Sequence, residues 1–262
     1  MSRICPLFSG SKANSTYIGT RAGGILVDAG ASLKGMEAAL QSAGGSLEEI
    51  IAVAVTHEHT DHIKGLKTLL NKTNARLIAS QQTLEALRGL DRIPAGTRVE
   101  ALEDGALEVG GIALSRFATS HDCEGSGGYT FILPDGKKVA VCTDLGVVTD
   151  EVRSAISGSD LVLLESNHDV EMLKRGPYPP LLKLRILSDT GHISNATCAA
   201  ELAGLLKGGA TRFILGHLSQ NNNTPELARG CAEAALMDIG ARSGKDYILS
   251  VAAPTGNGVI VL

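Results

Sequence analysis

The chain has 262 residues, long enough to bury a hydrophobic core in one large α/β domain or in two small ones. Hydrophobic residues make up 44% and charged residues 20%, which excludes the biased compositions of disordered chains. The formal net charge of −4 gives no general attraction to nucleic acid, so binding of that kind requires a local basic patch.

The first residues lack the charged start and apolar stretch of a secretory signal, and no run of about 20 apolar residues follows them. We therefore expect a cytoplasmic protein that does not associate with membranes. The five cysteines are scattered and form no Cys-x-x-Cys pair, so we expect them to be reduced packing residues.

The first third of the chain predicts strands over 3–8, 15–19 and 24–28, followed by an amphipathic helix over 32–43 that ends at two glycines. A continuous apolar run over 51–55 is typical of a strand buried on both faces. A cluster of histidines begins directly after this strand. It therefore lies at the strand's C-terminal end, where α/β proteins favour ligand sites.

The middle of the chain predicts mostly sheet, with short strands over 76–79, 98–102, 112–119, 129–133 and 139–142. Helices over 150–157, 194–206 and 225–239 then alternate with strands over 161–164, 212–215, 247–251 and 259–262. Ser194 and Thr224 are expected N-caps, and Gly240 ends the last helix. We expect a single domain over 1–262.

The histidine cluster reads Thr56-His57-Glu58-His59-Thr60-Asp61-His62, with three imidazoles and one carboxylate in six positions. Imidazole and carboxylate ligands suit zinc, manganese or iron. An extended loop lets His57 and His59 point the same way, and Asp61 and His62 at the next helix can serve a second ion. The alternative is a polar surface cluster in which Thr60 or Asp61 caps a helix.

Further short motifs follow in order along the chain: Val27-Asp28-Ala29-Gly30, then Ser120-His121, Thr143-Asp144 and Gly216-His217-Leu218-Ser219. Together with His-x-His-x-Asp-His, they resemble the metallo-β-lactamase superfamily over the whole chain. The resemblance implies an α/β fold, an αββα sandwich of two mixed sheets flanked by helices, with a metal site along one edge.

The resemblance also implies the site residues. His57, His59 and His121 would hold one divalent metal ion, and Asp61, His62 and His217 a second, while Asp144 would bridge the two. Asp28 would orient ligands by hydrogen bonding. A hydroxide held between the ions would be the nucleophile.

Two further features narrow the resemblance. Glu165 ends the strand over 161–164, and His192 stands in Gly191-His192-Ile193-Ser194; both are similar to a phosphodiesterase branch that includes tRNase Z. There His192, oriented by Glu165, would protonate the leaving alkoxide. Asp61, Asp144, Glu165 and His192 are thus the expected catalytic residues, although the hydroxyl of Ser194 is offset by one position.

Segments 8–11, 165–169 and 217–222 resemble the bacterial YycJ (WalJ) subgroup, which is regarded as DNA exonuclease-like. We therefore expect a nucleic-acid substrate, DNA before RNA. His168 either contacts the substrate or caps or packs at the start of the next helix. A basic segment around the proline-rich turn 176–180 either contacts phosphates or is a solvated loop; its cations are Lys174, Arg175, Lys183 and Arg185.

Two alternatives to a nuclease remain. A small-molecule hydrolase of the same fold would cleave a thioester, a lactone or, least in keeping with the missing signal peptide, a β-lactam. A structural metal or nucleic-acid-binding module fits poorly, because a structural zinc site closes with four ligands whereas seven are expected here over two ions.

Overall fold

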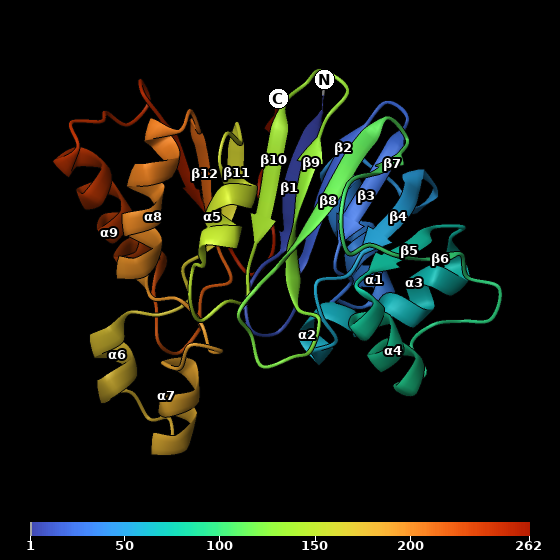
Figure 1. Ribbon diagram of the computed structural model, residues 1–262, viewed down its shortest axis with the longest axis horizontal. Coiled ribbons are helices and arrows are strands. Elements are labelled where there is room, and N and C mark those ends of the chain that lie inside the picture. Colours follow the sequence, from blue (N-terminus) through green and yellow to red (C-terminus); the bar gives the residue numbers. More distant parts are fainter. Residues whose placement is uncertain (1) are drawn as a thin grey trace.

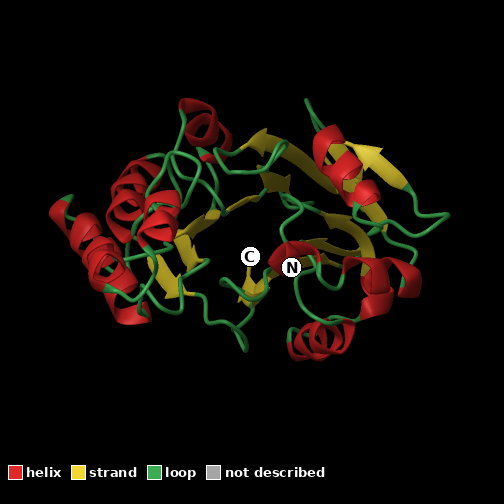
Figure 2. Cartoon of the chain, turned by 90° about the horizontal axis from the view of Figure 1, so that it is seen from below, coloured by secondary structure: helices red, strands yellow, loops and turns green. Residues whose placement is uncertain are grey.

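The computed structural model describes residues 2–262, so Met1 of the expected 1–262 domain lies outside the described part. Within residues 2–262, two seven-stranded sheets pack face to face and helices cover their outer sides (Figures 1 and 2). The predicted αββα sandwich is confirmed. Over the same residues, no helix is long and apolar enough to cross a membrane.

The first sheet has the strand order β14-β1-β2-β3-β4-β5-β6 and the second the order β13-β12-β11-β10-β9-β8-β7. The first consists of β1 (Arg3–Phe8), β2 (Ser15–Thr20), β3 (Gly23–Val27), β4 (Ile50–Ala54), β5 (Arg76–Ala79), β6 (Val99–Ala101) and β14 (Ile260–Val261). The second consists of β7 (Leu107–Val109), β8 (Ile112–Ala118), β9 (Gly127–Ile132), β10 (Lys138–Cys142), β11 (Leu161–Glu165), β12 (Arg212–Gly216) and β13 (Ile248–Val251).

Both sheets are mixed, because β3 to β6 and β10 to β13 are parallel while the remaining pairs are antiparallel. The helices beside the first sheet are α1 (Leu33–Ser42), η1 (Leu47–Glu49), α2 (Thr60–Ile63), α3 (Leu66–Lys72) and α4 (Gln81–Gly89). Those of the second half are α5 (Asp150–Ile156), α6 (Val170–Arg175), α7 (Pro180–Ile186), α8 (Asn195–Lys207) and α9 (Pro225–Asp238).

Three apolar layers hold these elements together, one between the sheets and one under each set of helices. In β11, Leu161 and Leu163 join the layer between the sheets, whereas Val162 and Leu164 face the helices. This alternation follows from the two-residue period of a strand. It explains why the strand is apolar at every position and why its polar end, Glu165, is left at the edge.

The predicted caps are confirmed: Ser194 Oγ accepts from Thr197 N, and Thr224 Oγ1 accepts from Leu227 N. The prediction that the middle is mostly sheet was wrong between β5 and β6, where α4 intervenes. Ser80 caps this helix by accepting from the Thr83 amide. The proline-rich turn is also shorter than expected, because Pro180 begins α7 as its first residue.

Candidate metal centre

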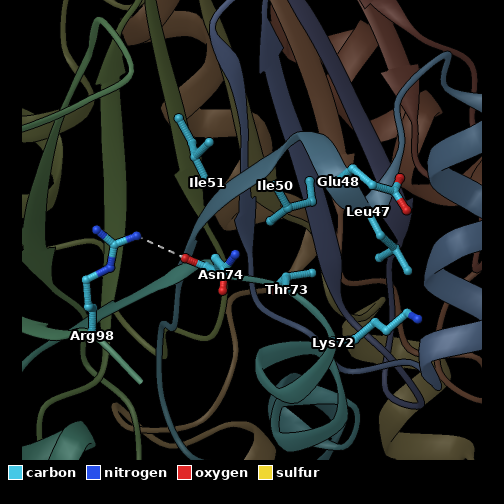
Figure 3. Close-up of a pocket in the computed structure, with 8 residues that line it drawn as sticks. All are labelled: Leu47, Glu48, Ile50, Ile51, Lys72, Thr73, Asn74 and Arg98. Carbon is cyan, nitrogen blue, oxygen red and sulfur yellow. Dashed lines mark hydrogen bonds between the residues drawn. The ribbon is translucent and has the colours of Figure 1, made fainter. Parts of the chain in front are cut away.

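A groove of about 350 Å³ lies at the starts of β4, β5 and β6 (Figure 3). In it, Arg98 Nη2 donates to the Asn74 carbonyl oxygen over 3.3 Å. These strands are parallel, so the groove lies at the end of the sheet opposite the histidine cluster. It offers one carboxylate, Glu48, and no histidine, so it does not match the predicted chemistry.

The predicted site residues gather at the other end, where strands of both sheets finish. Asp28 directly follows β3, His57 and His59 lie in the loop after β4, and Asp61 and His62 belong to the short helix α2. From the second sheet, Asp144 follows β10, Glu165 ends β11 and His217 follows β12, while His121 and His192 lie in loops after β8 and α7. Both sheets therefore contribute to one edge.

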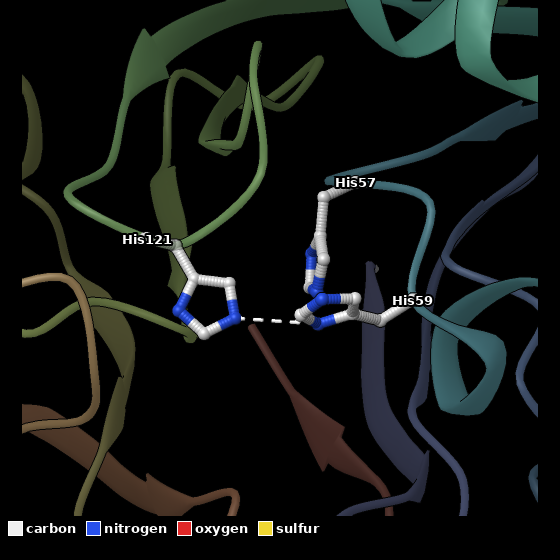
Figure 4. A group of neighbouring side chains, drawn as sticks. All are labelled: His57, His59 and His121. Atoms are coloured by element: carbon white, nitrogen blue, oxygen red, sulfur yellow. Dashed lines mark hydrogen bonds between the residues drawn. The ribbon is translucent and has the colours of Figure 1, made fainter. Parts of the chain in front are cut away.

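The rings of His57, His59 and His121 form the first group (Figure 4). Figure 4 shows His57 and His59 on one loop and His121 reaching toward them from the opposite loop. His59 Nδ1 and His121 Nε2 are 3.4 Å apart, and the His57 ring centroid lies 4.6 Å from that of His59. Each residue offers a ligand atom within 4.8 Å of the others. The structure thus brings together the three imidazoles expected for one ion.

Asp61, His62 and His217 form the second group. Asp61 Oδ2 lies 3.4 Å from His62 Nε2 and 3.8 Å from His217 Nε2. Asp144 stands between the two groups, since its Oδ1 is 3.9 Å from His121 Nε2 and its Oδ2 is 3.4 Å from His62 Nε2. Asp144 Oδ1 also lies 3.4 Å from His217 Nδ1, so this carboxylate stands beside members of both groups, as expected of a bridging ligand.

Buried polar atoms without a hydrogen-bond partner, here called orphaned atoms, indicate what the two groups would hold. Among residues 2–262, His57 Nε2, His217 Nε2 and Asp144 Oδ2 are buried and have no hydrogen-bond partner. Buried polar atoms are normally satisfied, so three such atoms at one edge call for a further partner. Neutral imidazole and carboxylate are a donor set for a divalent cation such as zinc, manganese or iron. The residues fit the metal that the sequence implied.

The buried carboxylates and imidazoles at this edge shift one another's pKa values. Burial opposes ionisation of Asp144, but His217, His62 and His57 outweigh it and hold the pKa of this carboxyl well below its usual value. Burial likewise disfavours charge on His62, yet Asp144 and Asp28 raise its pKa well above the ordinary range. His217 behaves in the same way, and its pKa rises to about 10. A bound cation would take the place of these protons.

The backbone adopts the left-handed conformation at three site residues. The φ angles are 64° at Asp28, 61° at Asp144 and 54° at His217. Each residue follows a strand within two positions, and none is a glycine. Such angles cost about 1–3 kcal/mol each and occur mainly at functional sites. Strain at these positions indicates that the direction of each side chain matters more than local stability.

Asp28 acts on the edge through hydrogen bonds, as the sequence predicted. Its Oδ2 accepts from His62 Nδ1 over 2.8 Å, and its Oδ1 accepts from the Thr56 amide over 2.8 Å. Thr56 Oγ1 in turn lies 2.9 Å from His57 Nδ1. One carboxylate therefore orients a ring in each group. Thr56, which the sequence marks only as the first residue of the cluster, thus connects Asp28 to His57.

Sequence reasoning missed Asn14. Its Nδ2 donates to Asp61 Oδ2 over 3.0 Å and lies 3.0 Å from His62 Nε2, and its backbone amide donates to the Asp61 carbonyl. Gly30 is required beside it, because a Cβ there would lie 1.6 Å from the Asp61 carbonyl oxygen. Gly30 ends the quoted Val-Asp-Ala-Gly motif, whereas no pattern in the sequence singles out Asn14.

Glu165 joins two histidines. Its Oε1 accepts from His192 Nδ1 and from His217 Nδ1, both over 2.8 Å, and its Oε2 accepts from the Ile193 and Leu145 amides. Burial would raise the pKa of Glu165, but the two imidazoles hold it at about 2. Burial would lower the pKa of His192, but Glu165 outweighs it and raises that pKa. A charged Glu165–His192 pair follows.

Asp144, Glu165, His192 and His217 also lie within 4.8 Å of one another and form a further candidate group for a metal. Both histidines direct Nδ1 at the same oxygen of Glu165, at hydrogen-bond distance. An ion cannot share that oxygen with two N–H donors. We therefore interpret this group as a hydrogen-bonded network beside the two metal groups.

The expected substrate residues lie near the same edge. His168 is buried, and both its ring nitrogens have no partner in the described part of the chain. Burial lowers the pKa of His168 to about 4, against the charge of Glu165. Its backbone carbonyl accepts from the Asn195 amide, and Asp169, not His168, caps α6 through the Met172 amide. The predicted capping alternative for His168 was therefore wrong, and packing or substrate contact remain.

The four cations of the basic segment differ in their surroundings. Lys174 and Arg175 are exposed in the last turn of α6 and lie 3.3 and 3.4 Å from Glu171. Lys183, on α7, donates to the Lys174 carbonyl. Arg185 Nε lies 2.5 Å from Asp122 Oδ2 and is thus tied to the loop that carries His121. Lys183 and Arg185 therefore lie on helix α7 and not in a solvated loop.

Known proteins resemble this chain over most of its length. Residues 24–218 match the β-lactamase superfamily domain. The chain is 37% identical over 242 residues to the exodeoxyribonuclease YycJ of Bacillus anthracis, which covers 92% of this chain and 91% of that protein. It is 37% identical to the exodeoxyribonuclease WalJ of Streptococcus pneumoniae, over 85% of this chain and 83% of that protein. The crystal structure of Zn²⁺-bound PqqB from Methylobacterium extorquens superposes with a TM-score of 0.70 at 18% identity, covering both chains completely.

Proposed function

Since the chain belongs to the β-lactamase superfamily, we propose that it is a dinuclear metal-dependent phosphodiesterase that degrades DNA from an end. Relatives with 37% identity over most of their length are exodeoxyribonucleases, and the chain is an enzyme, a metal-dependent, nuclease-like hydrolase. The proposal of a two-metal phosphodiesterase is supported by one observation. The two ligand groups face each other with Asp144 between them, and the Glu165–His192 pair lies beside them.

Two ions of zinc or manganese, or alternatively iron, are our proposed cofactors. His57, His59 and His121 would hold the first, Asp61, His62 and His217 the second, and Asp144 both. The orphaned nitrogens and oxygen at this edge support the assignment. When bound, a pair of divalent ions supplies an activated water near neutral pH and stabilises charge at the reacting phosphate.

The proton for the leaving group would come from His192. Its Nδ1 donates to Glu165, which leaves Nε2 as the nitrogen that can face a substrate. Glu165 raises the pKa of His192, which favours the protonated ring, and Nε2–H can then protonate a leaving alkoxide. An alkoxide requires this proton far more than a stabilised leaving group does, which favours a phosphodiester over a strained lactam.

Lys174 and Arg175 are our proposed contacts to DNA phosphates. Figure 1 shows α6 and α7 together at the site end of the second sheet. The two side chains pair only with the exposed Glu171, and surface pairs of this kind contribute at most about 1 kcal/mol. They can therefore exchange Glu171 for phosphate at little cost. A substrate contact by His168 is part of the same proposal.

The basic contacts can be tested by charge reversal. Lys174→Glu combined with Arg175→Glu should raise the KM for DNA and flatten its salt dependence, because fewer condensed counterions are released. Hydrolysis of bis-p-nitrophenyl phosphate should be unchanged. The matched control reverses Lys72 and Arg98, two cations of the groove at the opposite end, and should leave the KM as it is. Equal effects of the two double variants would refute the contact.

The activity itself is tested with metal-loaded protein and a panel of substrates. These are end-labelled single- and double-stranded DNA, RNA, bis-p-nitrophenyl phosphate, a thioester, a lactone and a β-lactam. We expect mononucleotides or short products released from a DNA end, abolished by a chelator and restored by added metal. Preference for the thioester or the lactone at matched concentration would replace the nuclease by a small-molecule hydrolase.

Two broader expectations belong to the same proposal. A cytoplasmic location is the first. Residues 1–262 would form a single domain, for which the shared apolar layer between the two sheets is the support. Limited proteolysis tests the latter, since a single domain should be cut only near its ends or in exposed loops.

A further inference from the structure

Asp122 lies between the metal edge and helix α7. Its Oδ1 is 3.5 Å from His59 Nε2 and 3.4 Å from His121 Nε2, while its Oδ2 receives the Arg185 guanidinium at 2.5 Å. One carboxylate therefore faces two of the proposed ligands with one oxygen and a cation of α7 with the other. No role for Asp122 followed from the sequence, although it directly follows His121.

In four of the proposed ligand rings, the nitrogen that faces away from the other ligands has an oxygen close to it. On the side away from the neighbouring ligands, His57 Nδ1 has Thr56 Oγ1 at 2.9 Å and His62 Nδ1 has Asp28. His121 Nδ1 lies 3.1 Å from the Gly191 carbonyl, and His217 Nδ1 has Glu165. An oxygen in this place fixes the tautomer and the direction of a ligating ring.

His59 fits this pattern only through Asp122. Its Nδ1 points toward His121 Nε2 and its Nε2 toward Asp122. A neutral imidazole carries one N–H, so a metal on Nδ1 leaves the proton on Nε2, where a carboxylate oxygen can accept it. The side chain of His59 is 33% exposed whereas that of His62 is fully buried, so packing constrains His59 least. An oxygen partner therefore matters most for this ring.

We propose that Asp122 is a positioning residue that orients His59 for the first metal, and that Arg185 holds Asp122 in place. The inference rests on the proposed metal centre. It links α7 to the metal edge, because α7 carries Arg185 and the Ile186 carbonyl accepts from the His192 amide over 3.0 Å. The helix beside the proposed DNA contacts would thus be coupled to both the first metal and the proton donor.

The test measures metal binding without substrate. Zn²⁺ is titrated into metal-free protein in competition with a chromophoric chelator, and the visible spectrum of Co²⁺-loaded protein reports ligand geometry. Asp122→Ala should weaken one of the two Zn²⁺ sites by about 10–100-fold and change the Co²⁺ spectrum. Asp122→Asn keeps an acceptor oxygen and should be affected less. Arg185→Ala should show a smaller loss, which Arg185→Lys should partly restore.

The matched control is Arg153→Ala, which breaks an exposed arginine–carboxylate pair with Glu201 on the outer face, with no contact to the metal edge. It should leave both Zn²⁺ affinities unchanged. If Asp122→Ala and Asp122→Asn bind both ions as tightly as the parent, the positioning role is wrong. Complete loss of one equivalent even at saturating Zn²⁺ would instead make Asp122 a direct ligand and also overturn it. A parent that binds no Zn²⁺ would refute the metal centre itself.

Discussion

Replacing His192 by alanine separates proton donation from metal binding. The ring is 17% exposed, and its Nδ1 is engaged with Glu165, so its removal should neither unfold the protein nor open a metal group. A positioned general acid contributes about 10²–10⁴-fold to a rate, which equals about 3–5 kcal/mol of transition-state free energy. We expect a loss of this size in kcat/KM on DNA, whose leaving group is an alkoxide.

The prediction is tested by comparing the loss of kcat/KM on DNA with the loss on bis-p-nitrophenyl phosphate. On bis-p-nitrophenyl phosphate, p-nitrophenolate leaves without a proton, so His192→Ala should lose less than about tenfold. Steady-state kinetics on both substrates, with metal content measured on the same samples by elemental analysis, provide the assay. Equal losses on both substrates, or a variant that has lost bound metal, would refute the reasoning and favour the alternative group that includes His192 as a ligand.

Further predictions concern the metals and the backbone. Protein prepared without chelator should contain about two metal equivalents, and Asp144→Ala should lose the bridge and nearly all activity; one equivalent with full activity would contradict the two-metal centre. The raised pKa values of His62 and His217 mean that metal must displace their protons, so calorimetry in buffers of different ionisation enthalpy should detect proton release. The share of His217 in the metal-free protein's stability is fully present below about pH 6.5 and is lost as the pH rises toward about 10, so metal affinity should increase over that window. Metal affinity that is independent of pH would contradict this. Gly30→Ala should lower the melting temperature and the metal content together, since its Cβ would collide with the Asp61 carbonyl; calorimetry and elemental analysis would show an unchanged protein if this is wrong.

The sequence predicted those parts of the fold that depend on periodicity over several residues. Strands such as 161–164 and helices such as 194–206 agree with the structure to within one residue, because burial on both faces and a capping serine leave clear local patterns. Helix α4, which buries Thr83, Leu84 and Leu87, was missed by the sequence analysis. The three-residue β7 was also missed, because it has little pattern of its own, whereas the two-residue β14 lies within the predicted strand 259–262.

For the site, residues in motifs could be predicted and their partners could not. His57 and His59 stand together in the chain, so their proximity follows from the sequence. Asn14 lies 47 positions before Asp61, and Arg185 lies 63 positions after Asp122, so only the folded chain brings the members of each pair together. The pairing of Arg185 with Asp122 could not be predicted either, because the sequence left open whether the basic segment is a solvated loop.

The division of the metal edge between the two sheets has a consequence during synthesis. His57, His59, Asp61 and His62 come from the first sheet, whereas His121, Asp144 and His217 come from the second. A nascent chain that has folded only its first half therefore has two of the three members of each proposed metal group. The proposed metal centre is complete only when the second sheet docks and supplies His121, Asp144 and His217.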